Sequence, residues 1–137
     1  MALISFEEIA TGTALPALSV HVTPSLIVAG ALASGDFEVV HHDQRAAQQR
    51  GTPDIFMNIL TTNGHVQRYV NDWTGGGARI CAVDIRLGVP NYAGDTLRLT
   101  GVVRAKEQGA ERRVEIAVRG ANSLGEHVTA TVRLVFP

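Results

Sequence analysis

Several features that would point to a secreted or membrane protein are scarce or absent in this sequence. Cys81 is the single cysteine, so no intrachain disulfide can form, which is typical of proteins in a reducing compartment. No apolar run is long enough to span a membrane. The first ten residues, MALISFEEIA, contain acidic residues where a secretory signal peptide would carry cations. The sequence therefore predicts a cytoplasmic protein that acts without a membrane.

The sequence also lacks a surplus of charge of one sign. It contains 12 Lys and Arg residues and 13 Asp and Glu residues, and the formal net charge is −1. This balance argues against a nucleic-acid-binding protein, which usually carries a basic surplus. Residues 79–137 nevertheless hold nine of the cations, and every cation except Lys106 is arginine, the side chain best suited to bidentate capture of phosphate. These arginines predict either solvated strand faces or contacts with a phosphorylated ligand.

What the chain does contain is enough hydrophobic sequence for a core. Hydrophobic residues make up 45% of the 137 residues, which predicts one domain spanning 1–137. From residue 79 onward the hydrophobic positions alternate, as they do in half-buried strands, and turn residues separate the alternating segments. The pattern predicts an antiparallel meander of four successive strands, centred on 83–89, 97–103, 114–118 and 128–136.

The part of the chain before these strands has helical periodicity. A short strand is predicted near residues 18–22, followed by short helices over 24–33 and 43–50. A longer segment, 54–72, carries an apolar stripe at helical spacing and an acidic residue at its start, where it complements the helix dipole. A sheet can bury such a helix by curling around it, so we predict an α+β hot-dog fold, an antiparallel sheet wrapped around a long central helix. The free sheet edge predicts side-by-side association with a like or related chain.

A polar segment between the two short helices contains the candidate catalytic residues. Asp36 and His41 are five residues apart, too far to stack along one helix, but a loop that reverses direction could bring both onto one water molecule. A carboxylate and an imidazole that share a water can remove one proton from it and return another, which is general acid–base catalysis. The alternative is that Asp36 caps nearby backbone and the histidine is a surface residue.

A metal site at His41, His42 and Asp43 is a second interpretation of the same segment. Adjacent ligands point to different sides of an extended chain, and no second cluster with ligand spacing follows. The glycine run 75–77 has neither the spacing nor the lysine of a phosphate-binding loop. We therefore expect neither a metal nor a bound cofactor.

The order of these motifs resembles that of a known enzyme family. Asp36 after a glycine, with His41 five residues later and a second aspartate beyond, is similar to the hydratase motif of the MaoC-like, or R-specific, enoyl-CoA hydratases of the hot-dog superfamily. Two later segments, Pro90–Leu97 and Asn122–Ala130, resemble further segments of that family. The resemblance covers residues 18–136. It implies that Asp36 and His41 activate the water.

Within this family, the chain is similar to the small subunits of actinobacterial steroid side-chain enoyl-CoA hydratases. The segments that carry this likeness are 36–43, 54–61, 66–73, 86–90 and 124–131. The resemblance implies addition of water to the side-chain double bond of a pregnadiene-carboxyl-CoA during degradation of cholesterol and related steroids, with coenzyme A as part of the substrate. It also implies a larger MaoC-like subunit as partner in an α2β2 hetero-oligomer, in which the small subunit supplies the aspartate and histidine.

The chain departs from the family at two places. Glu38-Val39 replaces the usual Asn-Pro between the catalytic residues, and Phe56-Met57 replaces the His-Gly that begins the central helix. The first amides of a helix lack intrahelical partners and favour negative charge, so they are suited to stabilising an enolate oxygen. We assign this oxyanion role to the backbone N–H of Met57 or Asn58.

Three alternatives stay open on the sequence alone. The chain could be a non-catalytic subunit that shapes its partner's acyl-CoA site, or a generic short-chain R-specific hydratase. A thioesterase of the same fold would need an acid on the central helix, and Asp54 is the only nearby candidate.

Sheet arginines such as Arg104, Arg112 and Arg119 are candidates for contacts with the phosphates of coenzyme A.

Overall fold

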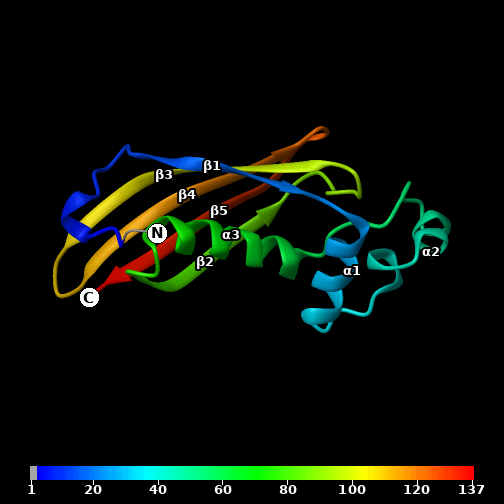
Figure 1. Ribbon diagram of the computed structural model, residues 1–137, viewed down its shortest axis with the longest axis horizontal. Coiled ribbons are helices and arrows are strands. Elements are labelled where there is room, and N and C mark those ends of the chain that lie inside the picture. The colour runs from blue at the N-terminus through cyan, green and yellow to red at the C-terminus, as the bar shows by residue number, and fades with distance from the viewer. Residues whose placement is uncertain (1–2) are drawn as a thin grey trace.

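The computed structural model describes residues 3–137, which contain a five-stranded antiparallel sheet. Across the sheet, the strands follow the order β1 (Ala14–His21), β3 (Thr96–Gln108), β4 (Arg112–Asn122), β5 (Gly125–Phe136) and β2 (Arg79–Leu87). Figure 1 shows this sheet curving along the long helix α3 (Ile59–Thr74). The predicted hot-dog fold is therefore confirmed.

Strand pairing differs from the predicted meander at one connection. β3, β4 and β5 form consecutive hairpins as expected, but β2 pairs with β5 and not with β3. Residues 88–95 carry the chain from β2, at one edge of the sheet, to β3, whose other neighbour is β1. The predicted pairing of the first two strands of the meander is wrong, because alternating hydrophobicity identifies the buried face of a strand and not its neighbour.

The long helix begins five residues later than predicted. α3 starts at Ile59, whereas the hydrophobic stripe predicts a helix from Asp54. The intervening segment pairs with the loop after β2: Phe56 forms a β-bridge with Tyr92, and the next backbone N–H donates to a carbonyl of that loop at 3.0 Å. These contacts replace helical hydrogen bonds, so the helix starts beyond them. Within residues 3–137, no helix is both long and apolar enough to cross a membrane.

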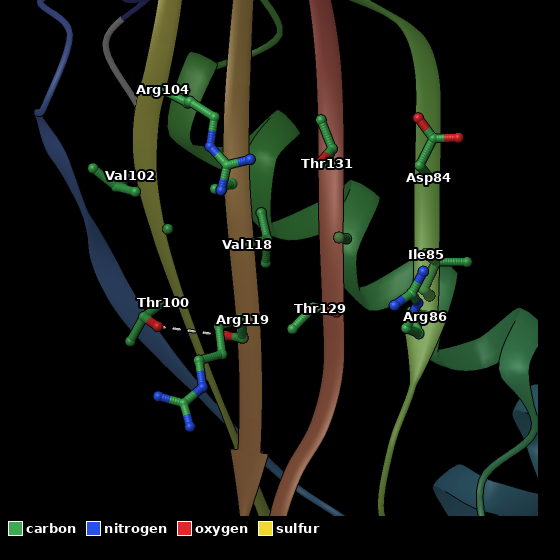
Figure 2. A pocket seen from close by; sticks show the side chains of 13 residues that line it. Asp84, Ile85, Arg86, Thr100, Val102, Arg104, Val118, Arg119, Thr129 and Thr131 are labelled. Atoms are coloured by element: carbon green, nitrogen blue, oxygen red, sulfur yellow. Dashed lines mark hydrogen bonds between the residues drawn. The ribbon is translucent and has the colours of Figure 1, made fainter.

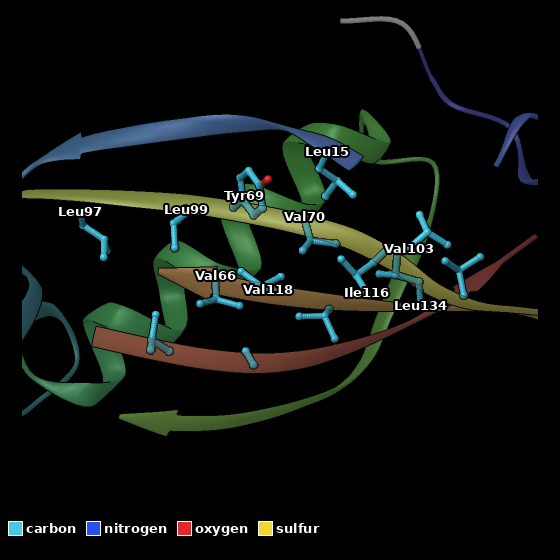
Figure 3. Packing of buried hydrophobic residues seen from close by; sticks show 14 of the residues in the cluster. Leu15, Val66, Tyr69, Val70, Leu97, Leu99, Val103, Ile116, Val118 and Leu134 are labelled. Atoms are coloured by element: carbon cyan, nitrogen blue, oxygen red, sulfur yellow. The ribbon is translucent and has the colours of Figure 1, made fainter. Parts of the chain in front are cut away.

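One side of α3 packs against the face of the sheet that curves around it. Val66 and Val70 are fully buried, and Tyr69 is nearly so. Figure 3 shows these side chains beside apolar residues of the central strands, such as Leu99 and Ile116. Because burying a side chain of this kind contributes about 1.5–3 kcal/mol, these three residues together contribute several kcal/mol to holding α3 on the sheet.

The remaining helices are short. They are η1 (Phe6–Glu8), α1 (Pro24–Ala33), η2 (Val39–His41) and α2 (Gln44–Gln49). The two α-helices lie where the sequence predicts them, and each begins at a side-chain cap: Thr23 accepts from the Leu26 N–H at 3.0 Å, and Asp43 accepts from the Ala46 N–H at 2.9 Å. Gly35, with φ of +73°, reverses the chain after α1. Figure 1 shows α1 and α2 together at one end of the molecule, beyond the start of α3.

Candidate active site

Asp36 and His41 lie beside each other, as a reversing loop requires. Asp36 follows the turn after α1, and His41 is the last residue of η2. His41 Nε2 lies 3.3 Å from Asp36 Oδ2. The His41 side chain is 9% exposed and the Asp36 side chain is 25% exposed. The imidazole is thus enclosed by protein, while the carboxylate can still be reached from solvent.

A backbone carbonyl fixes the tautomer of His41. Its Nδ1 lies 2.7 Å from the carbonyl oxygen of Phe56. Because a carbonyl can only accept a hydrogen bond, Nδ1 carries a proton and donates it. In the neutral imidazole, Nε2 is then unprotonated and faces the carboxylate of Asp36, which is also an acceptor. A water that donates one hydrogen to each would satisfy both groups, so the pair is arranged to bind a water and to accept a proton from it.

The carboxylate of Asp36 is held in its charged form. Its Oδ2 accepts a hydrogen bond from Asn58 Nδ2 at 3.1 Å, and its Oδ1 accepts one from the backbone N–H of Glu38 at 3.2 Å. The Asn58 donor first, and then the Glu38 N–H, hold the pKa of Asp36 below its ordinary value, with a smaller contribution from the imidazole of His41. The site therefore presents a negative charge to His41 at neutral pH.

The side chain of Asn58 is a part of the site that sequence reasoning missed. The motifs assign a role only to its backbone, yet its side chain contacts Asp36 and caps α3 by accepting from the Thr61 N–H at 3.1 Å. Asn58 is 2% exposed. An asparagine directly before a helix is a recognised start signal. The prediction of a helix from Asp54 places Asn58 inside the helix, so the signal is not recognised.

The two backbone groups assigned to the oxyanion differ in availability. The Met57 N–H donates to the carbonyl oxygen of Asn91 at 3.0 Å, so it is already used. The Asn58 N–H has no hydrogen-bond partner within residues 3–137. It also stands at the start of α3, where the helix dipole favours negative charge. Of the two candidates, the Asn58 N–H is the one that has no acceptor among residues 3–137.

The other polar residues singled out from the sequence have local structural roles. Asp43 caps α2, and His42 is exposed. Asp54 lies before α3 and accepts from the N–H of the next residue at 2.7 Å, so it is not the acid on the central helix that a thioesterase would need. Across residues 3–137, no group of three or more His, Cys, Asp and Glu side chains is placed to hold a metal ion.

The sheet arginines lie away from this pair within one chain. Arg104 and Arg119 line a shallow trough across β2 to β5. Figure 2 shows both side chains on the side of the sheet opposite α3. Arg119 also forms an ion pair with Glu126. Arg112 begins β4, at the end of the sheet farthest from α1 and α2 in Figure 1. Contacts of these arginines with the phosphates of a substrate bound at Asp36 are therefore not supported within one chain.

Comparison with known proteins identifies the family of this chain. The family described as MaoC like domain matches residues 6–123. This chain belongs to that family. Among curated proteins, the 3-oxo-4,17-pregnadiene-20-carboxyl-CoA hydratase beta subunit of Mycobacterium tuberculosis (strain ATCC 25618 / H37Rv) is 50% identical over 123 residues, which cover 90% of this chain and 93% of the relative. The resemblance drawn from the motifs is confirmed.

Solved structures are also similar to this MaoC-like chain. A chain of the ChsH1-ChsH2 complex from Mycobacterium tuberculosis matches with a TM-score of 0.89 and 48% identity, over 93% of this chain and 98% of that one. The unliganded R-hydratase PhaJ1 from Pseudomonas aeruginosa matches with a TM-score of 0.87 and 20% identity, over 96% and 84% of the two chains. The (R)-hydratase from A. caviae has a TM-score of 0.87 and 16% identity, over 96% and 99%. At these identities, the likeness to the two R-hydratases shows that the fold is shared and carries no further conclusion.

Proposed function

We propose that this MaoC-like chain is the catalytic subunit of an enoyl-CoA hydratase that adds water to the side-chain double bond of a steroid, a pregnadiene-carboxyl-CoA thioester. The observation that carries the proposal is the contact between Asp36 Oδ2 and His41 Nε2, in an imidazole whose Nδ1 donates to the Phe56 carbonyl. The 50% identical relative supports the substrate class, since it is named for this reaction. A cytoplasmic location accords with the single, exposed Cys81.

In the proposed reaction, Asp36 and His41 hold the water between them. One of the two groups removes a proton as the water oxygen bonds to the β-carbon of the enoyl thioester, and the π electrons move onto the thioester carbonyl as an enolate. A proton is then returned to the α-carbon, and the enolate collapses to the hydroxyacyl thioester. Atoms and charge balance without any cofactor, because coenzyme A remains part of the substrate throughout.

The backbone N–H of Asn58 is the proposed donor to the enolate oxygen. It has no partner within residues 3–137, and it belongs to the same residue whose side chain contacts Asp36. A donor fixed in place before the reaction stabilises developing negative charge without having to reorganise. The same short segment therefore supplies both the anchor of the carboxylate and the proposed oxyanion donor.

Exposed apolar side chains beside these residues support a large, hydrophobic acyl group or a covering subunit. Phe37 follows Asp36 and is 69% exposed, while Ile59 and Leu60 follow Asn58 and are 46% and 50% exposed. Apolar surface of this kind is stabilised when it is covered. We propose that a larger MaoC-like partner and the steroid together cover it in an α2β2 complex. The relative's designation as a beta subunit and the match to a two-protein complex support a hetero-oligomer.

Product analysis on the purified complex tests this function. The chain is co-purified with its partner from the native host and assayed on a steroid enoyl-CoA and on crotonyl-CoA, with and without the partner. Hydration of the steroid substrate by the complex is expected. Efficient hydration of crotonyl-CoA by the isolated chain would instead show a generic short-chain hydratase, and release of free coenzyme A would show a thioesterase.

Substitution in this chain separates a catalytic subunit from a passive one. Asp36→Asn is expected to lower kcat of the assembled complex about 10²- to 10⁴-fold, the usual contribution of a general acid–base group. Arg68→Gln is a control, because within residues 3–137 the ion-pair partner of Arg68 is Asp72, on the exposed side of α3. Wild-type turnover by an assembled Asp36→Asn complex would mean that the partner carries the chemistry.

A further inference from the structure

We propose that the side chain of Asn58 is a positioning residue: the capping geometry of α3 aims its amide at Asp36 and holds the catalytic carboxylate toward His41. The inference deepens the proposed function and rests on it. It concerns a side chain that contacts Asp36 and no reacting atom. Four contacts of one amide group, each with a defined donor and acceptor, carry the argument.

The oxygen of the Asn58 amide is identified by the cap itself. The backbone N–H of Thr61 can only donate, and it lies 3.1 Å from one atom of the amide, which must therefore be Oδ1. The Thr61 hydroxyl donates to the same oxygen. Because the two ends of the amide lie on opposite sides, the NH2 group must point away from α3. The helix cap thus determines which end of the amide faces Asp36.

The NH2 group has two partners, and both are acceptors. It donates to Asp36 Oδ2 at 3.1 Å and to Ser34 Oγ at 2.9 Å. The Ser34 hydroxyl lies 2.7 Å and 3.1 Å from the carbonyl oxygens of Gly30 and Ala31, so its own hydrogen is directed at α1 and its lone pairs are free to accept. With all its polar atoms paired and the residue 2% exposed, the amide has one stable orientation.

Close packing of α1 on α3 makes this arrangement possible. A Cβ at Gly30 would overlap the Thr61 side chain, so only glycine allows the two helices to approach here. The carbonyls that orient Ser34 come from the end of α1, and the capped turn comes from the start of α3. Asp36 lies on the loop between α1 and η2. The single side chain of Asn58 therefore fixes its position relative to both α1 and α3.

The expected consequence concerns both the charge and the direction of Asp36. Oδ2, the oxygen that accepts from Asn58, is also the oxygen that faces His41 Nε2. Without the amide, the partly exposed carboxylate is free to turn into solvent. Among residues 3–137, the titratable or charged side chains that the contacts place beside it are His41, which faces Oδ2, and Glu38 with its exposed ion-pair partner Arg50. α1 and the first turn of α3 carry no charged residue.

Asn58→Asp separates the two roles of the residue. Aspartate caps a helix as well as asparagine does, and the backbone N–H is retained, but the donor to Asp36 becomes a second carboxylate oxygen. In the assembled hydratase we expect kcat at pH 7 to fall about 10- to 100-fold, the range for loss of one hydrogen bond to a charged group. The acid limb of the pH profile of kcat/KM should move to higher pH, because the carboxylate loses its donor and gains a like charge.

A carboxyl titration followed by ¹³C NMR reports on the contact without any substrate. With this chain labelled at aspartate, the Asp36 resonance is assigned by its absence in Asp36→Asn. Its pKa should rise in Asn58→Asp and, by a smaller amount, in Asn58→Ser, which keeps a cap but has no amide. Thr23→Asp is the matched control, since it adds the same charge at the cap of α1 and should leave the Asp36 titration unchanged.

The outcomes separate this inference from the proposed function. An Asp36 titration identical to wild type in folded Asn58→Asp, or in Asn58→Ser if the aspartate variant does not assemble, would overturn the positioning role. Full hydration by Asp36→Asn would overturn the proposed function, while a shifted Asp36 titration in the Asn58 variants would still establish the contact. Loss of activity with no shift of pKa or pH profile would mean that the side chain of Asn58 acts only as a helix cap.

Discussion

Replacing His41 by asparagine isolates the ring nitrogen that the mechanism uses. The amide nitrogen of asparagine occupies nearly the place of Nδ1, so His41→Asn can keep the hydrogen bond to the Phe56 carbonyl, 2.7 Å long in the wild type, and remove only Nε2. His41→Ala removes both nitrogens. The pair of variants therefore distinguishes the chemistry of the imidazole from its contribution to stability.

The magnitudes follow from what each variant leaves behind. Loss of a general acid–base group lowers kcat about 10²- to 10⁴-fold, which raises the barrier by about 2.7–5.4 kcal/mol. Both variants should show this loss. His41→Ala also leaves the Phe56 carbonyl without its partner next to a new cavity, at a cost of about 1–3 kcal/mol in the free energy of unfolding for the carbonyl alone. His41→Asn should retain most of that stability.

Two measurements check these values. Hydration is followed in the assembled complex by the loss of ultraviolet absorbance of the conjugated enoyl thioester, and stability by urea unfolding of the isolated chain. A folded His41→Asn variant with kcat within about threefold of wild type would refute the role of Nε2, since a true acid–base group contributes far more. Equal destabilisation by the two variants would refute a stabilising role of the hydrogen bond between Nδ1 and the Phe56 carbonyl.

Three further predictions concern stability. Burial lowers the pKa of His127 below its ordinary value of 6.5, so on acidification the unfolded state takes up the proton before the folded state does. The free energy of unfolding should therefore be greatest above the pKa of the unfolded state and should fall as the pH decreases below it. A urea midpoint that rises on acidification would contradict this. Gly120→Ala places a Cβ 2.6 Å from Val128 Cγ1 in the core and should cost about 1–3 kcal/mol in thermal unfolding with little change in kcat. Gly30→Ala should lower stability and kcat together, because its Cβ would push α1 away from the Thr61 turn; unchanged kcat would show that the active site does not depend on this approach.

The fold was largely predictable because burial leaves a periodic trace in the sequence. The alternation in β3, β4 and β5 and the helical stripe of α3 are direct consequences of one face being covered. The partner of β2 and the first residue of α3 were not predictable in this way. Both are decided by hydrogen bonds between distant backbone segments, such as the bridge of Phe56 to Tyr92, which leave no periodic pattern.

The sequence by itself determined the chemical groups of the candidate site: a carboxylate, an imidazole, and a loop short enough to bring Asp36 and His41 together. Only the tertiary structure decided the state of those groups. The proton on His41 Nδ1 is assigned by a carbonyl 15 residues away, and the direction of Asp36 is set by an amide 22 residues away. Such contacts depend on how closely α1 packs on α3, and that distance is a property of the folded core, which local sequence does not encode.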